Sequence, residues 1–225
     1  MQARQANSPT ADQALSQLCE AYWRPLYAFF RRQVHHAEDA QDLTQGLFVS
    51  LLQRDFVHNV DADRGRLRAF LIAAARHFLS NEQARQRTVK RGGGIRHLSI
   101  DWTAAEDRFQ SIDRGLSADN MFDREWAVAL LDRVLQQLQQ DYAGRGKQRL
   151  FDLLSPALSE TEFNYESVCR ELQISNDAAR VALHRLRRKY RELLRREIAE
   201  TTEHDRDIDD ELQELFRILL AARPA

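Results

Sequence analysis

Residues 165–194 read YESVCRELQISNDAARVALHRLRRKYRELL, and the spacing of their apolar residues is helical. Apolar positions recur every three to four residues on both sides of a short break at Gln173 and Ile174. Ser175, just before the second periodic run, is a favourable N-cap residue. The first helix should therefore end near Leu172, and the whole stretch has the layout of a helix-turn-helix.

The second helix of this pair has two different faces. At 100° per residue its apolar residues form one stripe, which should pack on the first helix through Val168 and Leu172. The stripe consists of Ala179, Leu183, Leu186 and Tyr190. The opposite sector consists of Asp177, Arg180, His184, Arg187, Arg188, Arg191 and Arg195. Such a basic face can neutralise phosphates and release counterions, so it predicts DNA binding that weakens steeply with salt.

The start of the second helix is where base edges in a major groove would be reached. The residues placed there are Asn176, Asp177, Arg180, Val181 and His184. A solvated basic helix without any ligand is the alternative interpretation of the same charges. Gln173 occupies a position that favours glycine, because a left-handed backbone costs a residue with a side chain about 1 kcal/mol.

Helical periodicity extends over nearly the whole chain of 225 residues, which has only eight glycines and four prolines. The pattern predicts an all-α protein with two small helical domains, a flexible linker and a C-terminal helical extension. We expect the first domain at residues 14–91, with periodic runs at 14–32, 37–54 and 66–90, the linker at 92–120, the second domain at 121–200 and the extension at 201–225. The linker is predicted from three consecutive glycines and lost periodicity.

The net charge of −1 conceals a local asymmetry. Residues 180–196 contain eight arginines or lysines against one glutamate, whereas residues 200–214 contain eight acids against Arg206. The chain lacks both an apolar run long enough for a bilayer and the apolar core of a secretory signal, which predicts a cytoplasmic protein. Cys19 and Cys169 lie far apart in the sequence and suggest buried thiols rather than a disulfide or a zinc site.

A different surface is predicted for residues 38–53. One half of this helix carries Ala40, Leu43, Leu47, Phe48, Leu51 and Leu52, and the other half carries Glu38, Asp39, Asp42, Gln45, Gly46, Ser50 and Gln53. Glu38 and Asp39 suit a helix N-terminus because acids there interact favourably with the helix dipole. Asp42 and Gln45, next to the small Gly46, instead suit docking against a helix that brings arginines.

A third feature lies between Arg64 and Arg91, where basic residues recur around Phe70 and Phe78. Basic residues interleaved with aromatic ones suit a separated nucleic-acid strand, since phosphates need cations and unstacked bases need flat apolar pockets. A core role for both phenylalanines is the alternative, and the simpler one.

Taken in order, these segments resemble an extracytoplasmic-function (ECF) sigma factor over about residues 14–200. YWRPLYAFFRR resembles the first helix of sigma region two, AEDAQDLTQGLF its polymerase-docking helix, and RGRLRAFLIAAARHFLSNEQARQR its promoter-melting segment. NYESVCRELQISNDAARVALHRLRRKYRELL resembles region four. The wording of RPLYAF, DAQDLTQG, RGRLRAFL and KRGGG is most similar to a subgroup abundant in planctomycetes and related bacteria, often found beside protein kinases.

The resemblance implies a role for each of these surfaces. Residues implied to bind the coiled coil of the polymerase beta-prime subunit are Asp39, Asp42, Leu43 and Gln45. Residues implied to capture the melted minus-ten element are Arg68, Arg76, His77, Asn81 and Arg85, together with the break at residues 56–66. Residues implied to read the minus-thirty-five element are Asn176, Arg180, His184, Arg187 and Arg188. The linker would follow the path toward the RNA exit.

The partners implied in this way are core RNA polymerase, through its beta-prime coiled coil and beta flap, and promoter DNA. An anti-sigma factor or a Ser/Thr kinase would be a further partner, and the free chain would be monomeric. No cofactor, metal or enzymatic activity is implied. Several positions differ from better-known groups, with Phe70 in place of tryptophan, His77 in place of asparagine, Asn81 where aspartate is frequent, and Val181 and Ala182 in place of polar residues. The promoter sequence therefore does not transfer from those groups.

The extension after Glu200 exceeds the minimal length of such factors. Its apolar residues Ile208, Leu212, Leu215, Phe216 and Leu219 need an apolar surface to pack on. One hypothesis is that its acids cover the basic face of residues 180–196 when DNA is absent.

Two other classes of protein fit parts of the pattern. A helix-turn-helix regulator would bind duplex operator DNA on its own, commonly as a dimer, and would need no polymerase surface. An enzyme would have to use the cluster of His35, His36, Glu38 and Asp39, but the adjacent histidines point to different faces of a helix. No phosphate-binding loop, nucleophile elbow or dinucleotide-binding turn accompanies that cluster.

Overall fold

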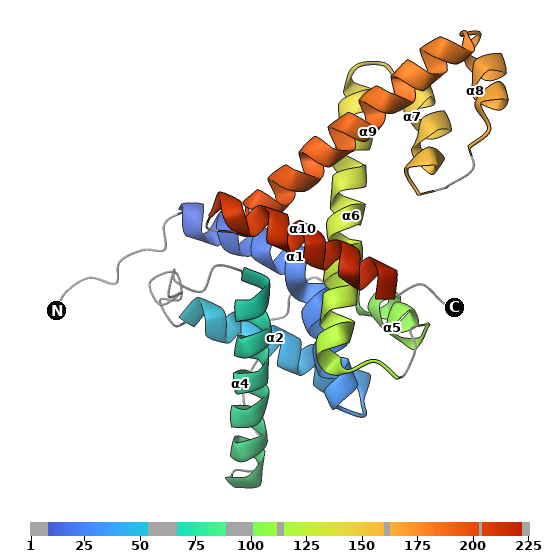
Figure 1. The fold of residues 1–225 in the computed structure, drawn as a ribbon. Helices are drawn as coiled ribbons and strands as arrows, with labels where there is room; N and C mark the ends of the chain where they lie inside the picture. Colours follow the sequence, from blue (N-terminus) through green and yellow to red (C-terminus); the bar gives the residue numbers. More distant parts are fainter. Residues whose placement is uncertain are drawn as a thin grey trace. The chain divides into compact units, whose positions relative to one another are not determined.

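The computed structural model describes residues 9–53, 67–88, 101–111, 115–159, 163–202 and 204–221 (Figure 1). Within these ranges the regular elements are α-helices and one short 3-10 helix, so the predicted all-α fold class is confirmed. The chain divides into two compact units, Met1–Ala129 with Thr201–Ala225 and Leu130–Glu200. The second unit is therefore an insertion between two parts of the first.

The first unit is built on the long helix α1. Its helices are α1 (Pro9–Gln33), α2 (Ala37–Gln53), α4 (Leu67–Thr88), α5 (Trp102–Gln110), the first part of α6 (Ala118–Gly144) and α10 (Asp205–Ala221). The central side chains of α1 are almost fully buried: Tyr22, Leu26, Tyr27, Phe29 and Phe30. Neighbouring helices of the same unit add further buried residues: Leu47 and Phe48 of α2, Leu71 and Ala75 of α4, and Met121 and Phe122 of α6. This burial explains why three runs predicted as one domain form helices together.

The second unit contains the rest of α6, α7 (Gln148–Leu154), the 3-10 helix η2 (Ser155–Leu158), α8 (Tyr165–Leu172) and α9 (Asn176–Ala199). The predicted break after residue 142 is a turn in which Gly146 has a φ of 66°, a conformation that favours glycine. The core of this unit includes Val134, Leu138, Phe151, Leu154, Val168, Ala179, Leu183, Leu186, Leu194 and Ile198. All of these residues come from helical runs that the sequence predicts.

Part of the predicted linker is the helix α5. Asp101 caps it by accepting a hydrogen bond from the backbone N–H of Ala104 at 3.1 Å. Trp102 contacts the rings of Trp23 and Tyr27 of α1, with centroids 5.7 and 5.5 Å away. The sequence prediction missed this helix because the glycine run and scattered charges before and after it obscure a short apolar face.

A carboxylate joins α5 to α1. Glu106 accepts hydrogen bonds from the Tyr27 hydroxyl at 2.5 Å and from the guanidinium of Arg31 at 2.9 Å. Burial alone would raise the pKa of Glu106, but the hydrogen bonds from Arg31, Tyr27 and Gln110 lower it below its ordinary value. Burial and the bond to Glu106 raise the pKa of Tyr27. The pair therefore keeps an ionised carboxylate and a protonated phenol at neutral pH.

The C-terminal extension forms α10, which belongs to the first unit. Its buried stripe consists of Ile208, Glu211, Leu215 and Ile218, whereas Phe216 is 56% exposed. The predicted packing stripe is thus rotated, because Phe216 lies outside it and Ile218 inside it. A backbone hydrogen bond from Leu67 to the carbonyl of Thr201, 3.2 Å long, joins the start of α4 to the chain just before α10.

The remaining sequence expectations concern membranes and thiols. In the described part of the chain, no helix has the length and apolar character needed to cross a bilayer. Cys19 and Cys169 are both free and half-buried. Burial raises the pKa of the Cys19 thiol to about 11, so that this thiol stays protonated at neutral pH. The functional division into domains at 14–91 and 121–200 stays a prediction, and the compact units have different boundaries.

Candidate polymerase and nucleic-acid interfaces

The first half of α2 presents an acidic surface. Glu38 and Asp39 lie in its first turn and Asp42 follows one turn later, and all three side chains are exposed. Leu43 is only 8% exposed and packs inward beside them. Three neighbouring carboxylates are therefore accessible to another molecule, as the sequence predicts, while an apolar residue fixes the helix beneath them.

Gln45 and Gly46, in contrast, face the protein interior. Gln45 is 3% exposed, and among the described residues its Oε1 atom has no hydrogen-bond donor. A Cβ atom on Gly46 would lie 2.9 Å from Cζ of Phe78 in α4. The helix that approaches this small residue thus belongs to the chain itself. The role of Gln45 in polymerase binding stays a prediction, but its side chain lies on the covered side of the helix.

Arg68 lies at the start of α4 and is buried in an ion-pair cluster. Its guanidinium donates to Glu211 of α10 at 2.7 Å and to Asp123 of α6, and it lies 4.9 Å from the ring centroid of Trp126. Its side chain is 9% exposed. Burial alone would lower the pKa of Arg68, but Glu211 and Asp123 raise it overall. In Figure 1 the first turn of α4 lies beside α10.

The sequence prediction missed Asp123 and Glu211 as partners of Arg68. One signal was present, because Glu211 lies on the same stripe as Ile208 and Leu215. A carboxylate within an apolar helical stripe indicates a buried charge, and a buried charge needs a cationic partner. The sequence does not identify Arg68 as that partner, since the two residues are 143 positions apart.

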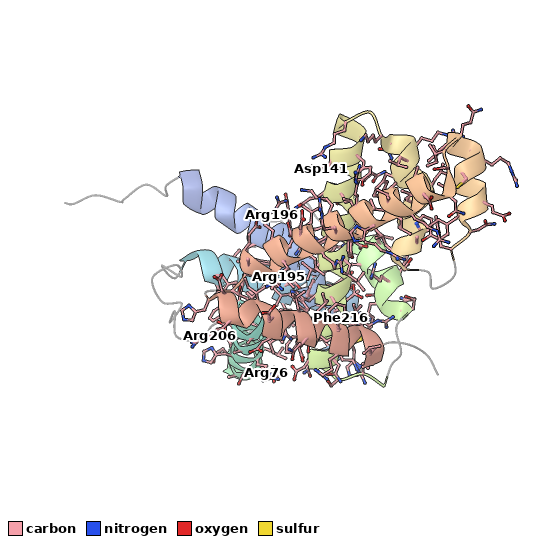
Figure 2. All side chains as sticks on the ribbon, turned by 45° about the horizontal axis from the view of Figure 1, so that its top comes forward. Arg76, Asp141, Arg195, Arg196, Arg206 and Phe216 are labelled. Carbon is pink, nitrogen blue, oxygen red and sulfur yellow. The ribbon has the colours of Figure 1, made fainter. Side chains whose placement is uncertain are left out.

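The other predicted minus-ten residues of α4 lie on an exposed surface. Arg76, which is labelled in Figure 2, forms an ion pair with Asp119 of α6, and its side chain is 59% exposed. The ring of His77 is 3.1 Å from the side-chain amide of Asn81, one helical turn away. Arg85 pairs with Glu82 at 2.9 Å. The side chains of Arg76, His77, Asn81 and Arg85 are therefore all exposed along α4, whereas the side chain of Arg68 is buried. Residues 56–66, predicted to take part in the same function, lie outside the described residues.

In the second unit, the ends of α8 and α9 agree with the sequence prediction. Helix α8 ends at Leu172, and Gln173 follows in a left-handed conformation with a φ of 52°. Ser175 caps α9 by accepting a hydrogen bond from the backbone N–H of Ala178 at 3.2 Å. The predicted end of the first helix, the strained Gln173 and the N-cap are confirmed. Of the four predicted stripe residues, Ala179, Leu183 and Leu186 are buried, whereas Tyr190 is half-buried.

The opposite side of α9 is an exposed basic face, which we define as Arg180, His184, Arg187, Arg188, Arg191 and Arg195. All five predicted minus-thirty-five residues are exposed: Asn176, Arg180, His184, Arg187 and Arg188. The Arg180 Nε atom donates to Asn176 Oδ1 at 2.8 Å, and its guanidinium lies 5.3 Å from the ring centroid of Tyr165 in α8. Arg187 donates to the carbonyl of Ala157 at 2.8 Å. Both partners of Arg180, and that of Arg187, are uncharged.

The described residues offer no cluster of metal ligands. Over the described ranges, His, Cys, Asp and Glu side chains form no group of three or more that could hold a metal ion. His35, His36, Glu38 and Asp39 lie at the junction of α1 and α2, and all four are exposed.

Part of the chain matches a known protein family. Residues 18–89, which include α2 and α4, match the family described as Sigma-70 region 2. No curated protein and no solved structure matches the chain significantly. The match supports a sigma factor of the sigma-70 family, with a role in RNA polymerase binding and promoter recognition.

Proposed function

We propose that this protein is an alternative sigma factor of the ECF type, similar to the planctomycete subgroup. It binds core RNA polymerase and directs promoter-specific transcription initiation by binding DNA and opening its strands. It acts in the cytoplasm and is not an enzyme. The observation that carries the proposal is the exposed acidic start of α2, at Asp39 and Asp42, inside the segment that matches Sigma-70 region 2.

The proposed polymerase contact combines exposed carboxylates with a buried apolar residue that packs beneath them. Asp39 and Asp42 are exposed one turn apart, where they suit bidentate pairing with arginines of the beta-prime coiled coil. Leu43 keeps the helix in place from below. The unit that contains α8 and α9 would bind the beta flap. Regulation would come from an anti-sigma factor or a Ser/Thr kinase.

The promoter contact uses both units. The exposed part of α4, with Arg76, His77, Asn81 and Arg85, is the candidate surface for the melted minus-ten strand. The start of α9 and its basic face are the candidate surface for the minus-thirty-five element. Arg68 joins the minus-ten surface only if it exchanges the carboxylates of Glu211 and Asp123 for phosphates.

Charge reversal at Asp42 tests the polymerase contact. We expect Asp42→Arg to weaken association with core polymerase more than tenfold, as measured by fluorescence anisotropy of labelled protein. Asp152→Arg is the matched control, because Asp152 is an exposed acid of α7 and the change in net charge is the same. Both variants should unfold in urea at the wild-type midpoint, since exposed charges contribute little to stability.

The opposite result supports the rival function, a helix-turn-helix regulator that acts without polymerase. In that case wild-type protein would not bind core polymerase, and it would bind duplex operator DNA alone. Reconstituted transcription with core polymerase and a genomic promoter library then decides between the two. Transcripts that start at defined promoters support a sigma factor, and their absence despite duplex binding supports the regulator.

A further inference from the structure

Val181 is a large apolar residue on the accessible side of α9. It is 50% exposed, and it is the sixth residue of a helix that begins at Asn176. At 100° per residue it lies about 200° from both Ala179 and Leu183, which are buried. Its exposure therefore follows from its position on the helix and not from a gap in the core. Its neighbours one turn on, His184 and Arg185, are exposed as well.

The arginine next to Val181 is held by contacts within the unit. Arg180 is fixed between Asn176 Oδ1 and the face of the Tyr165 ring. That ring is itself held edge-to-face by Phe163, with centroids 5.1 Å apart. These contacts direct the Arg180 guanidinium toward α8. In that direction it is better placed to contact a DNA phosphate than the edge of a base in the major groove. The second turn of α9 is left with Val181 at its surface.

We propose that Val181 is a specificity-determining residue that contacts the C5 methyl group of a thymine in the upstream promoter element. The inference rests on the proposed function and adds to it the base that this position selects. Valine has no hydrogen-bonding group, so it cannot read the donors and acceptors of a base pair. The C5 methyl group of thymine is the one apolar group that a base edge presents in the major groove.

Charge explains why DNA, rather than a protein, is the occupant of this site. The basic face, with Arg187, Arg188, Arg191 and Arg195, continues along the helix beyond Val181, and all these side chains are exposed. A single valine at the front of such a face is too small for a protein interface. Its size matches one methyl group of a base. The arginines of the basic face would hold α9 in the major groove by contacting the neighbouring phosphates.

Replacement of thymine by deoxyuridine tests the contact, because it removes only the methyl group. The probe is the duplex promoter that the reconstituted wild-type complex selects from the library, with each upstream thymine replaced in turn. At one position we expect about fourfold weaker binding by the wild-type complex, the effect of losing one buried methyl group. Val181→Ala should bind the unmodified duplex about fourfold more weakly and should lose sensitivity to deoxyuridine at that position only.

Leu135→Ala is the matched control, because Leu135 is an exposed apolar residue of the same unit, on α6. It should leave binding and the deoxyuridine profile unchanged. The inference is overturned if Val181→Ala keeps the full deoxyuridine profile of the wild type, or if the selected upstream element has no preferred thymine. Failure to select any promoter would instead contradict the proposed function, so the two failures are distinguishable.

Discussion

Helices α4 and α9 are both rich in arginine, and the sequence predicts DNA contacts for both, but their arginines have different partners. On α4, each predicted arginine is paired with a carboxylate: Arg68 with Glu211 and Asp123, Arg76 with Asp119, and Arg85 with Glu82. On α9, Arg180 and Arg187 hydrogen-bond to uncharged oxygens. Arg188 pairs with Glu192 across an exposed 3.5 Å contact.

This difference separates cations that hold the fold from cations that remain available. A phosphate approaching Arg180 or Arg187 of α9 can pair with a cation that hydrogen-bonds to an uncharged oxygen. A phosphate approaching Arg68 must replace the buried carboxylate of Glu211 and the partly buried one of Asp123, and it must open the contact between α4 and α10. We therefore expect α9 to bind duplex DNA at low energetic cost. Contacts at α4 should begin at its exposed part, around Arg76 and His77.

The largest expected effect is the loss of stability in Arg68→Ala. Removing one partner of a buried ion pair leaves uncompensated charges, which costs about 3–5 kcal/mol. The free energy of unfolding, measured for the full chain in urea, should fall by that amount. Arg188→Ala on α9 should change it by no more than about 0.5 kcal/mol, because its pair is exposed.

For affinity to duplex promoter DNA, we expect the opposite order: Arg188→Ala should have the larger effect and Arg68→Ala the smaller one. Arg188→Ala should lower the slope of log affinity against log salt for duplex promoter DNA by about 0.9, the value for one phosphate contact. If Arg68→Ala unfolds like the wild type and loses affinity for the minus-ten strand, Arg68 is a DNA contact and not a residue that holds the fold. That result would remove the contrast between the two helices.

A smaller effect is expected where α5 meets α1. Glu106→Gln removes a charged acceptor from Tyr27 and Arg31, which should cost about 2 kcal/mol at pH 7. Because the pKa of Glu106 is lowered in the folded protein, its contribution is present above the pKa of the unfolded chain, about 4.3. It is lost as the pH falls from there through the folded pKa. The variant should therefore lose less stability than the wild type between pH 5 and pH 3.

Fluorescence can follow this step, since Trp102 of α5 packs against Trp23 and Tyr27. Glu82→Gln is the matched control on α4, where the paired arginine side chain is 69% exposed. It should keep the pH profile of the wild type. Identical acid profiles for Glu106→Gln and the wild type would mean that this carboxylate does not hold α5 in place.

Local signals explain what the sequence predicts well. Neighbouring residues determine the end of α8, the left-handed conformation of Gln173 and the Ser175 cap. They also determine which side of α9 is buried and which side is basic. The contacts that the sequence missed depend on partners far away in the chain. Arg68 meets Asp123 and Glu211 at separations of 55 and 143 residues.

Periodicity has a second limit, because it cannot tell which element covers a polar position. Gln45 shares the polar half of its helix with Asp42, yet it is 3% exposed while Asp42 lies at the surface. At the next residue, Gly46, α4 approaches α2 so closely that a Cβ atom would lie 2.9 Å from Cζ of Phe78. A short apolar face between glycines, as in α5, is missed for a related reason, since its partner on α1 is about 75 residues away.

The smallest expected effect is the change in unfolding free energy when a glycine is replaced by alanine in each of the two units. Gly46→Ala in α2 places a Cβ atom 2.9 Å from Phe78 Cζ, so the ring must shift. The strain of about 1–3 kcal/mol should exceed the gain of about 1 kcal/mol in helix propensity, for a net loss of about 1 kcal/mol in urea unfolding. Gly144→Ala, at the end of α6, has no neighbouring atom within 4 Å and should instead gain about 0.5 kcal/mol. Equal stabilisation of both variants would mean that α2 and α4 are packed too loosely for the absence of a side chain at Gly46 to matter.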